Sequence, residues 1–123
     1  MKKILLVEDN EMNRDMLSRR LIRRGVEVAI AVDGRQGVEM ATTEMPDVIL
    51  MDMSLPEIDG WEATRMIKGN PQTSVIPVMG LTAHAMAGDR EKCLAAGCDE
   101  YGAKPVDFAD LIEKIQRLTG ESE

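Results

Sequence analysis

Short apolar runs alternate with longer amphipathic segments along the chain, and the apolar runs predict β-strands. The clearest run is Val48-Ile49-Leu50-Met51, which follows Pro46-Asp47 and ends at Asp52. Because this run is continuous rather than alternating, it is typical of a strand covered on both faces, as in a parallel sheet with helices above and below. Shorter runs predict four more strands at residues 3–7, 26–31, 75–81 and 101–103.

The segments between these runs have helical periodicity. In the first segment, Met12, Met16, Leu17 and Leu21 recur at helical spacing with arginines between them, and Gly25 follows as a C-terminal cap. The fourth segment, over 86–96, has a weaker pattern with few large apolar residues. The features that predict the other helices are Asp33-Gly34 before Val38, Met40 and Ala41; the group Trp61, Thr64, Met66 and Ile67 before Gly69-Asn70-Pro71; and Asp107 before the stripe Phe108, Leu111, Ile112, Ile115 and Leu118.

Five strands that alternate with five helices predict an α/β fold, because each pair of parallel strands needs a crossover connection. Right-handed crossovers give a doubly wound, five-stranded parallel sheet of the flavodoxin-like type, with strand order 2-1-3-4-5. A chain of 123 residues is long enough for one such core, so we expect a single domain over 1–123.

Composition narrows the classes of function. The hydrophobic fraction of 44% and the charged fraction of 30% are ordinary for a globular domain, and no apolar run approaches the ~20 residues that span a bilayer. The apolar part of the N-terminus is too short for a secretory signal, so we expect a cytoplasmic protein with no membrane partner. The net charge is −7 without a long Lys/Arg run, which argues against direct nucleic-acid binding.

The two cysteines, Cys93 and Cys98, could be metal ligands, a disulfide or buried small side chains. No further cysteine accompanies them, and the single histidine, His84, is not in a metal-site spacing. We therefore interpret both as buried thiols.

Polar residues with chemical potential stand at the predicted strand ends. Glu8-Asp9 follow the first strand and Asp52 ends the third, while Thr82 follows the fourth strand and Lys104 the fifth. Since the carboxyl ends of parallel strands lie at one edge of the sheet, these side chains should converge there. Taken singly, each has an ordinary explanation as a helix-terminal acid, a packed hydroxyl or a surface lysine; their combination favours a site.

This set of residues suits phosphoryl transfer to an aspartate. Two carboxylates ~4 Å apart repel by about 4 kcal/mol at an effective dielectric near 20, so a cluster of three calls for a cation or a retained proton. Oxygen ligands favour a hard divalent ion, Mg²⁺ before Zn²⁺. Lys104 is a compact positive charge suited to a phosphoryl oxygen, and a carboxylate such as Asp52 is a competent nucleophile.

With these residues in this order, the chain resembles the receiver domains of response regulators in bacterial two-component signalling, of the chemotaxis-regulator-like, single-domain type. The resemblance covers essentially the whole chain, as a stand-alone regulator or as a receiver from a larger kinase. It rests on four motifs in this order: Leu6-Val7-Glu8-Asp9-Asn10, Leu50-Met51-Asp52-Met53-Ser54-Leu55-Pro56-Glu57-Ile58-Asp59-Gly60, Leu81-Thr82-Ala83 and Ala103-Lys104-Pro105.

The resemblance implies a role for each of these residues. Asp52 would accept a phosphoryl group from a histidine kinase or a phosphotransfer protein. Mg²⁺ would be held by Asp9, by Asp52 and by the backbone carbonyl of Ser54, with Glu8 acting more through water. Lys104 would pair with the phosphoryl oxygens, and its peptide bond to Pro105 would be cis. Thr82 and Tyr101 would act as switch residues.

The resemblance also implies an output. The surface formed by the fourth helix, fifth strand and fifth helix would change on phosphorylation and bind a downstream protein, with the chain a monomer or a weak dimer. Catalysis would be limited to the chain's own phosphorylation and dephosphorylation. Ser54 and His84 stand at the positions that tune the phosphate lifetime in this family, and neither predicts a definite rate.

Two other functions are open. One is a receiver-like interaction module that never accepts phosphate, although such a module would usually lack the acceptor or the lysine. The other, an aspartyl-phosphate phosphatase of the haloacid-dehalogenase type, needs an acid/base aspartate two residues after the nucleophile, where this chain has Ser54.

At two places small residues depart from the family's usual pattern. Gly80 lies inside the fourth strand, and Gly102-Ala103 precede Lys104. A glycine there either loosens the sheet beside Thr82 or leaves space that other side chains, such as methionines, fill. We favour the filled arrangement.

Overall fold

The fold is a five-stranded parallel sheet in the order β2-β1-β3-β4-β5, as expected from the sequence. The computed structural model describes residues 2–82 and 87–120. Strands and helices alternate along the chain in these bounds: β1 (Lys3–Val7), α1 (Glu11–Arg23), β2 (Glu27–Ala31), α2 (Gly34–Glu44), β3 (Val48–Asp52), α3 (Gly60–Lys68), β4 (Val78–Thr82), α4 (Ala87–Ala96), β5 (Glu100–Ala103) and α5 (Phe108–Thr119).

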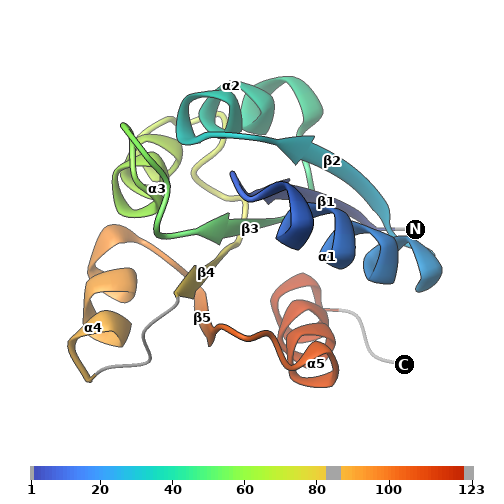
Figure 1. The fold of residues 1–123 in the computed structure, drawn as a ribbon. Coiled ribbons are helices and arrows are strands. Elements are labelled where there is room, and N and C mark those ends of the chain that lie inside the picture. Colours follow the sequence, from blue (N-terminus) through green and yellow to red (C-terminus); the bar gives the residue numbers. More distant parts are fainter. Residues whose placement is uncertain (1, 83–86, 121–123) are drawn as a thin grey trace.

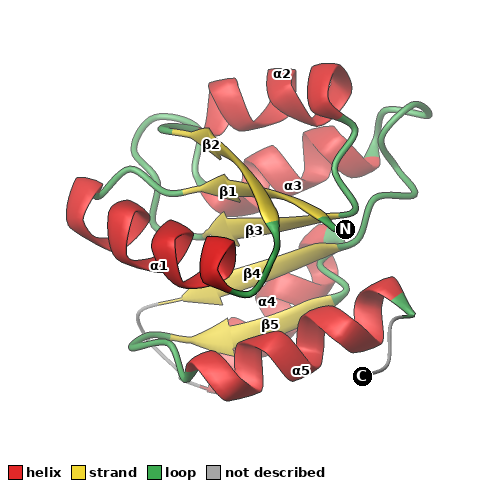
Figure 2. Ribbon diagram, turned by 90° about the vertical axis from the view of Figure 1, so that its right-hand side faces the viewer, coloured by secondary structure: helices red, strands yellow, loops and turns green. Residues whose placement is uncertain are grey.

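Helices cover both faces of the sheet. Figure 2 shows α1 and α5 in front of the strands and α3 and α4 behind them, with all strand arrows pointing to the same edge. Side chains alternate between the two faces, so that along β3 Ile49 and Met51 pack with α2, α3 and α4, while Val48 and Leu50 pack with α1 and α5. All five residues of β3 are buried, which explains its continuous apolar run.

Asx caps begin four helices. The side chains of Asn10, Asp33, Asp59 and Asp107 each accept a hydrogen bond from the backbone N–H three residues later. Gly25 follows α1 with a positive φ of 84°, as expected of a cap. The stripe predicted on α5 is also confirmed: Leu111, Ile112 and Ile115 are buried, and Phe108 and Leu118 pack against the same cluster.

The predicted apolar side of α1 is wrong in its first half. Met12 and Met16 are 76% and 57% exposed, whereas Leu17 and Leu21 are buried. The buried residues of the helix are Leu17, Ser18 and Leu21. Arg14 lies one turn before Leu17 and Ser18, so it is on the same, inward side of the helix. Figure 1 places α1 against β1 and β2, and Arg14 in the first turn of the helix contacts the loop that carries Glu8 and Asp9.

Other boundaries differ by smaller amounts. The predicted 75–81 strand begins only at Val78, because Pro77 precedes it and Val75 is 80% exposed in the preceding turn. β2 begins one residue later and β5 one residue earlier than predicted. Met86, at the predicted start of the fourth helix, lies outside the described residues. In the parts of the chain that the structure describes, no helix is both long and apolar enough to cross a membrane.

Candidate functional site

The polar residues at the strand ends meet at one edge of the sheet. Parallel pairing sets Val7 beside Met51, Asp52 beside Leu81, and Thr82 beside Ala103. Glu8 and Lys104 follow β1 and β5 directly, so their side chains leave from the same edge as Asp52 and Thr82. The convergence expected from the sequence is therefore present.

Three carboxylates form the centre of this edge. One carboxylate oxygen from each of Glu8, Asp9 and Asp52 lies within 4.8 Å of the other two. Glu8 and Asp52 are each only 2% exposed, while Asp9 is exposed. An all-oxygen, anionic donor set that is open on one side fits a hard divalent cation whose remaining ligands are waters or a phosphate.

Lys104 lies between the two buried acids. Its Nζ is 3.0 Å from Glu8 Oε1 and 3.3 Å from Asp52 Oδ2. Burial lowers the pKa of the Lys104 ammonium, but the hydrogen bond to Glu8 and the charge of Asp52 outweigh burial, and the pKa is raised overall. The lysine therefore carries its positive charge at neutral pH. The sequence had suggested only a phosphoryl partner for Lys104, and its pairing with Glu8 was not foreseen.

Glu8 has an environment that disfavours its charge. Burial is the largest cause that raises its pKa, and contact with Asp52 adds to the rise, while Lys104 opposes it. A buried carboxylate next to another acid is costly without a cation, which agrees with a site suited to a metal ion.

The loop after β3 folds back on Asp52. The Ser54 N–H donates to Asp52 Oδ1 at 3.0 Å, which orients one oxygen of the carboxylate. Gly60 packs so closely that a Cβ there would overlap the Asp52 carbonyl oxygen and lie 2.6 Å from Met53 Cα. Gly60 is thus a supporting residue of the site that sequence reasoning treated only as part of a loop; its place directly after the Asp59 cap was the available signal.

The residues expected to respond to the site lie on β4 and β5. Thr82 is buried at the tip of β4, and the Lys104 N–H donates to its carbonyl oxygen at 2.8 Å. Tyr101 is half-buried and packs against the cluster that includes Cys93 and Cys98. The Lys104–Pro105 peptide bond is cis, as expected. Ala83 and His84 lie outside the described residues.

The space beside Gly80 is filled, which confirms the favoured interpretation. A Cβ at Gly80 would lie 3.0 Å from both Cys93 Sγ and Met53 Cε, and 3.2 Å from Cys98 Sγ. At Gly102 the corresponding neighbours are Met79 Cε at 2.8 Å and Leu81 Cδ2 at 3.2 Å. Both cysteines are buried free thiols, also as predicted, and contact with Cys93 together with burial raises the pKa of the Cys98 thiol.

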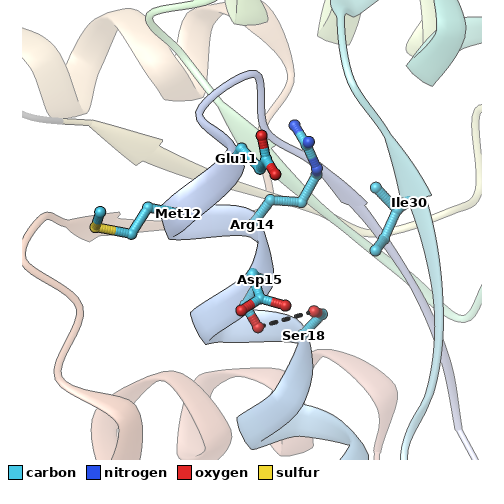
Figure 3. Close-up of a pocket in the computed structure, with 6 residues that line it drawn as sticks. All are labelled: Glu11, Met12, Arg14, Asp15, Ser18 and Ile30. Atoms are coloured by element: carbon cyan, nitrogen blue, oxygen red, sulfur yellow. Dashed lines mark hydrogen bonds between the residues drawn. The ribbon is translucent and has the colours of Figure 1, made fainter.

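Arg14 reaches the acidic loop from α1. In Figure 3 its side chain and that of Met12 leave opposite sides of the helix, with Arg14 on the side of Ile30 in β2. Its guanidinium contacts the loop that carries Glu8 and Asp9, and together with Glu11, Met12, Asp15, Ser18 and Ile30 it lines a cavity of about 570 Å³. Sequence reasoning missed Arg14, because it stands among several arginines between the apolar residues of this helix.

Comparison with known proteins agrees with this geometry. Residues 4–116 match the family profile described as response regulator receiver domain. The chain belongs to this family. It is 36% identical over 121 residues to the polar-differentiation response regulator DivK of Brucella anthropi, covering 98% of each chain.

Solved receiver structures have the same fold. The receiver domain of the sensor histidine kinase PA1611 from Pseudomonas aeruginosa, which has a magnesium ion coordinated in its active site cleft, is 42% identical with a TM-score of 0.90 and 98% coverage of both chains. The Vibrio cholerae chemotaxis protein CheY4 is 30% identical with a TM-score of 0.89, over 96% of this chain and 98% of that one. The chain is thus a receiver domain of two-component signalling, a class of signalling switches rather than classical enzymes.

Proposed function

We propose that residues 1–123 form one phosphorylation-dependent switch in which Asp52 accepts a phosphoryl group from a histidine kinase or a phosphotransfer protein. The observation that carries this proposal is the surroundings of Asp52: a buried carboxylate at a strand tip, with two further acids within 4.8 Å and the Lys104 ammonium at 3.3 Å. Mg²⁺ is the proposed cofactor, since a magnesium ion occupies the cleft of the related PA1611 receiver.

In the proposed reaction an oxygen of Asp52 forms the new bond to phosphorus, the bond from phosphorus to the donor's histidine nitrogen breaks, and that nitrogen regains a proton. Asp9, Asp52, Glu8 through water, and the Ser54 carbonyl would hold Mg²⁺. The ion supplies positive charge against the oxygens of the transferring group. Lys104 adds a second positive charge and stays oriented by Glu8, while the Ser54 N–H steadies the acceptor carboxylate.

The proposed conformational response depends on the charge that phosphorylation adds to Asp52. A phosphoryl group brings about −1.5 to −2 charges and new acceptor oxygens, and the hydroxyl of Thr82 lies on the neighbouring strand tip. We propose that Thr82 and Tyr101 pass this change to the α4–β5–α5 surface, which then binds a downstream protein. Location in the cytoplasm, a monomeric or weakly dimeric state, and action without direct contact to nucleic acid or membrane belong to the same proposal.

Phosphorylation with acetyl phosphate and Mg²⁺ tests the proposal. We expect Asp52→Asn to abolish incorporation, because the amide cannot act as the nucleophile, while Thr82→Ala still incorporates phosphate. Asp47→Asn is the matched control, since Asp47 precedes the same strand at its opposite end and its carboxylate accepts from the Lys3 N–H. Undiminished incorporation in Asp52→Asn would refute the assignment of the acceptor.

A further inference from the structure

Arg14 occupies a position on α1 where the helix periodicity calls for a core residue. It stands three residues before Leu17, four before Ser18 and seven before Leu21, and those three residues are buried. Arg14 itself is half-buried, unlike the more exposed Arg19 and Arg20 on the same helix. An arginine is tolerated on the inward face only if its head finds hydrogen-bond acceptors.

The acceptors are backbone carbonyls of the acidic loop. Arg14 Nη1 donates to Glu8 O at 3.0 Å and is 3.3 Å from Asp9 O, the second acceptor. The same loop is held from its other side by the Glu8 N–H, which donates to Ala31 O at 3.1 Å. The Arg14 guanidinium therefore binds the carbonyl groups of two consecutive residues, Glu8 and Asp9, which are two of the three acids of the cluster.

Asp9 depends on this restraint more than Glu8 does. The Glu8 carboxylate is fixed by Lys104 at 3.0 Å and by the Asn10 N–H at 3.2 Å. The Asp9 carboxylate is exposed, so the position of the Asp9 backbone sets where its oxygens can reach. Freezing that backbone before a cation arrives lowers the ordering cost of binding.

We propose that Arg14 is a positioning residue that sets the divalent-cation affinity of the site by fixing the backbone of Glu8 and Asp9. This inference rests on the proposed function, in which the three acids hold Mg²⁺. The charge of Arg14 acts in the opposite direction, since a cation near the cluster repels Mg²⁺. Removing the guanidinium would weaken Mg²⁺ binding through the loss of positioning and strengthen it through the loss of repulsion. We expect the loss of positioning to have the larger effect.

The test is a calorimetric Mg²⁺ titration of the full chain with Arg14→Met, Arg14→Lys and the control Arg19→Met. Arg19 is 71% exposed and its guanidinium pairs with Asp15 one turn away, so its removal matches the loss of charge on α1 without touching the loop. We expect Arg14→Met to weaken Mg²⁺ binding by about tenfold, the size found when groups that orient metal ligands are removed. Arg14→Lys should recover part of this loss, and Arg19→Met should stay within about twofold of the wild type.

A second readout separates positioning from damage to the fold. At saturating Mg²⁺ the rate of phosphorylation by acetyl phosphate should return close to the wild-type rate in Arg14→Met, because Arg14 contacts no reacting atom. Unchanged or tighter Mg²⁺ binding by Arg14→Met would overturn the proposal, as would a loss of rate that saturating Mg²⁺ does not restore. Should Arg14→Met unfold, Arg14→Lys decides by the same criteria. Failure of the wild type to bind Mg²⁺ would instead refute the proposed function.

Discussion

The acidic loop between β1 and α1 and the helix α4 behind the sheet are held in different ways. The loop is bonded through its backbone on both sides, by Arg14 from α1 and by Ala31 O from β2. The residues of α4 that the core buries are Cys93 and Ala96, two small side chains, among those the structure describes. By contrast α5, on the other face, buries Leu111, Ile112 and Ile115.

In the switch that we propose, this difference separates the groups that bind Mg²⁺ and the phosphoryl group from those that respond to phosphorylation. A metal site needs ligands within fractions of an ångström of their final positions, so a loop with bonded carbonyls suits it. Within residues 90–96 the core buries only a thiol and a methyl group of α4, which is little apolar area, so we expect this part of the helix to shift at a low cost in free energy. The fold therefore combines an acidic loop that is bonded through its backbone with a lightly anchored side next to Thr82 and Gly80.

Removing Lys104 should have the largest effect, on the side of the acidic loop. We expect Lys104→Met to destabilise the metal-free protein by about 2 kcal/mol at pH 7, less than the 3–5 kcal/mol of a fully buried pair because the lysine side chain is 21% exposed. The cause is that Glu8 and Asp52 then repel each other without a counter-charge. Urea unfolding measures the loss.

Mg²⁺ provides the control for Lys104→Met. If repulsion between the acids is the cause, saturating Mg²⁺ should restore most of the lost stability. Equal destabilisation with and without Mg²⁺ would contradict this account and indicate a packing role for the lysine stem.

Gly80→Ala tests the lightly anchored side. The new Cβ would crowd Cys93 Sγ and Met53 Cε at 3.0 Å, and we expect a loss of about 1 kcal/mol, at the lower end of overpacking costs because Met53 can move. Combining it with Cys93→Ala, which removes one crowding atom, should recover part of the loss in a double-mutant cycle of thermal unfolding. Strict additivity of the two changes would show that α4 does not limit the space beside Gly80.

Glu8→Gln should give the smallest effect, and it should reduce the pH dependence of stability. In the metal-free protein the folded pKa of Glu8 is raised above its ordinary value of 4.5, so the folded state holds this proton more tightly than the unfolded state. Its contribution to stability is full below pH 4.5 and is lost as the pH rises through the raised pKa. We expect Glu8→Gln to remove this decline, so that its stability relative to the wild type rises as the pH increases towards 7.

Thermal unfolding in a chelator across pH 4 to 8 would measure the effect of Glu8→Gln. Glu44→Gln is a useful control because Glu44 pairs with Lys3, at the opposite end of β1 from Glu8. A parallel decline with pH in wild type and Glu8→Gln would locate the responsible group elsewhere.

The sheet and the strand-tip residues could be predicted because they follow from simple regularities. A continuous apolar run such as Val48–Met51 identifies a doubly covered strand, and parallel strands bring Glu8, Asp52 and Lys104 to one edge whatever the details of packing. The Asp107 cap could be predicted for the same reason, since its hydrogen bond from the Asp110 N–H is a local contact.

What the sequence could not predict depends on long-range contacts. Helical spacing alone does not say which side of α1 faces the sheet, and the methionines at 12 and 16 appeared a better core than Arg14. Only the position of the acidic loop shows why an arginine belongs on the inward side. In the same way, the filling of Gly80 by Cys93 and Met53 required the packing of α4 and of the β3–α3 loop.

The most direct test of the central claim is to locate the phosphoryl group itself. The full chain would be treated with acetyl phosphate and Mg²⁺, the acyl phosphate reduced with borohydride, and the modified residue identified by peptide mass spectrometry. We expect the aspartate at position 52 to be converted to homoserine, and we expect omission of Mg²⁺ to remove the signal. Modification of Asp9 or another carboxylate, or no modification although Mg²⁺ is bound, would contradict it.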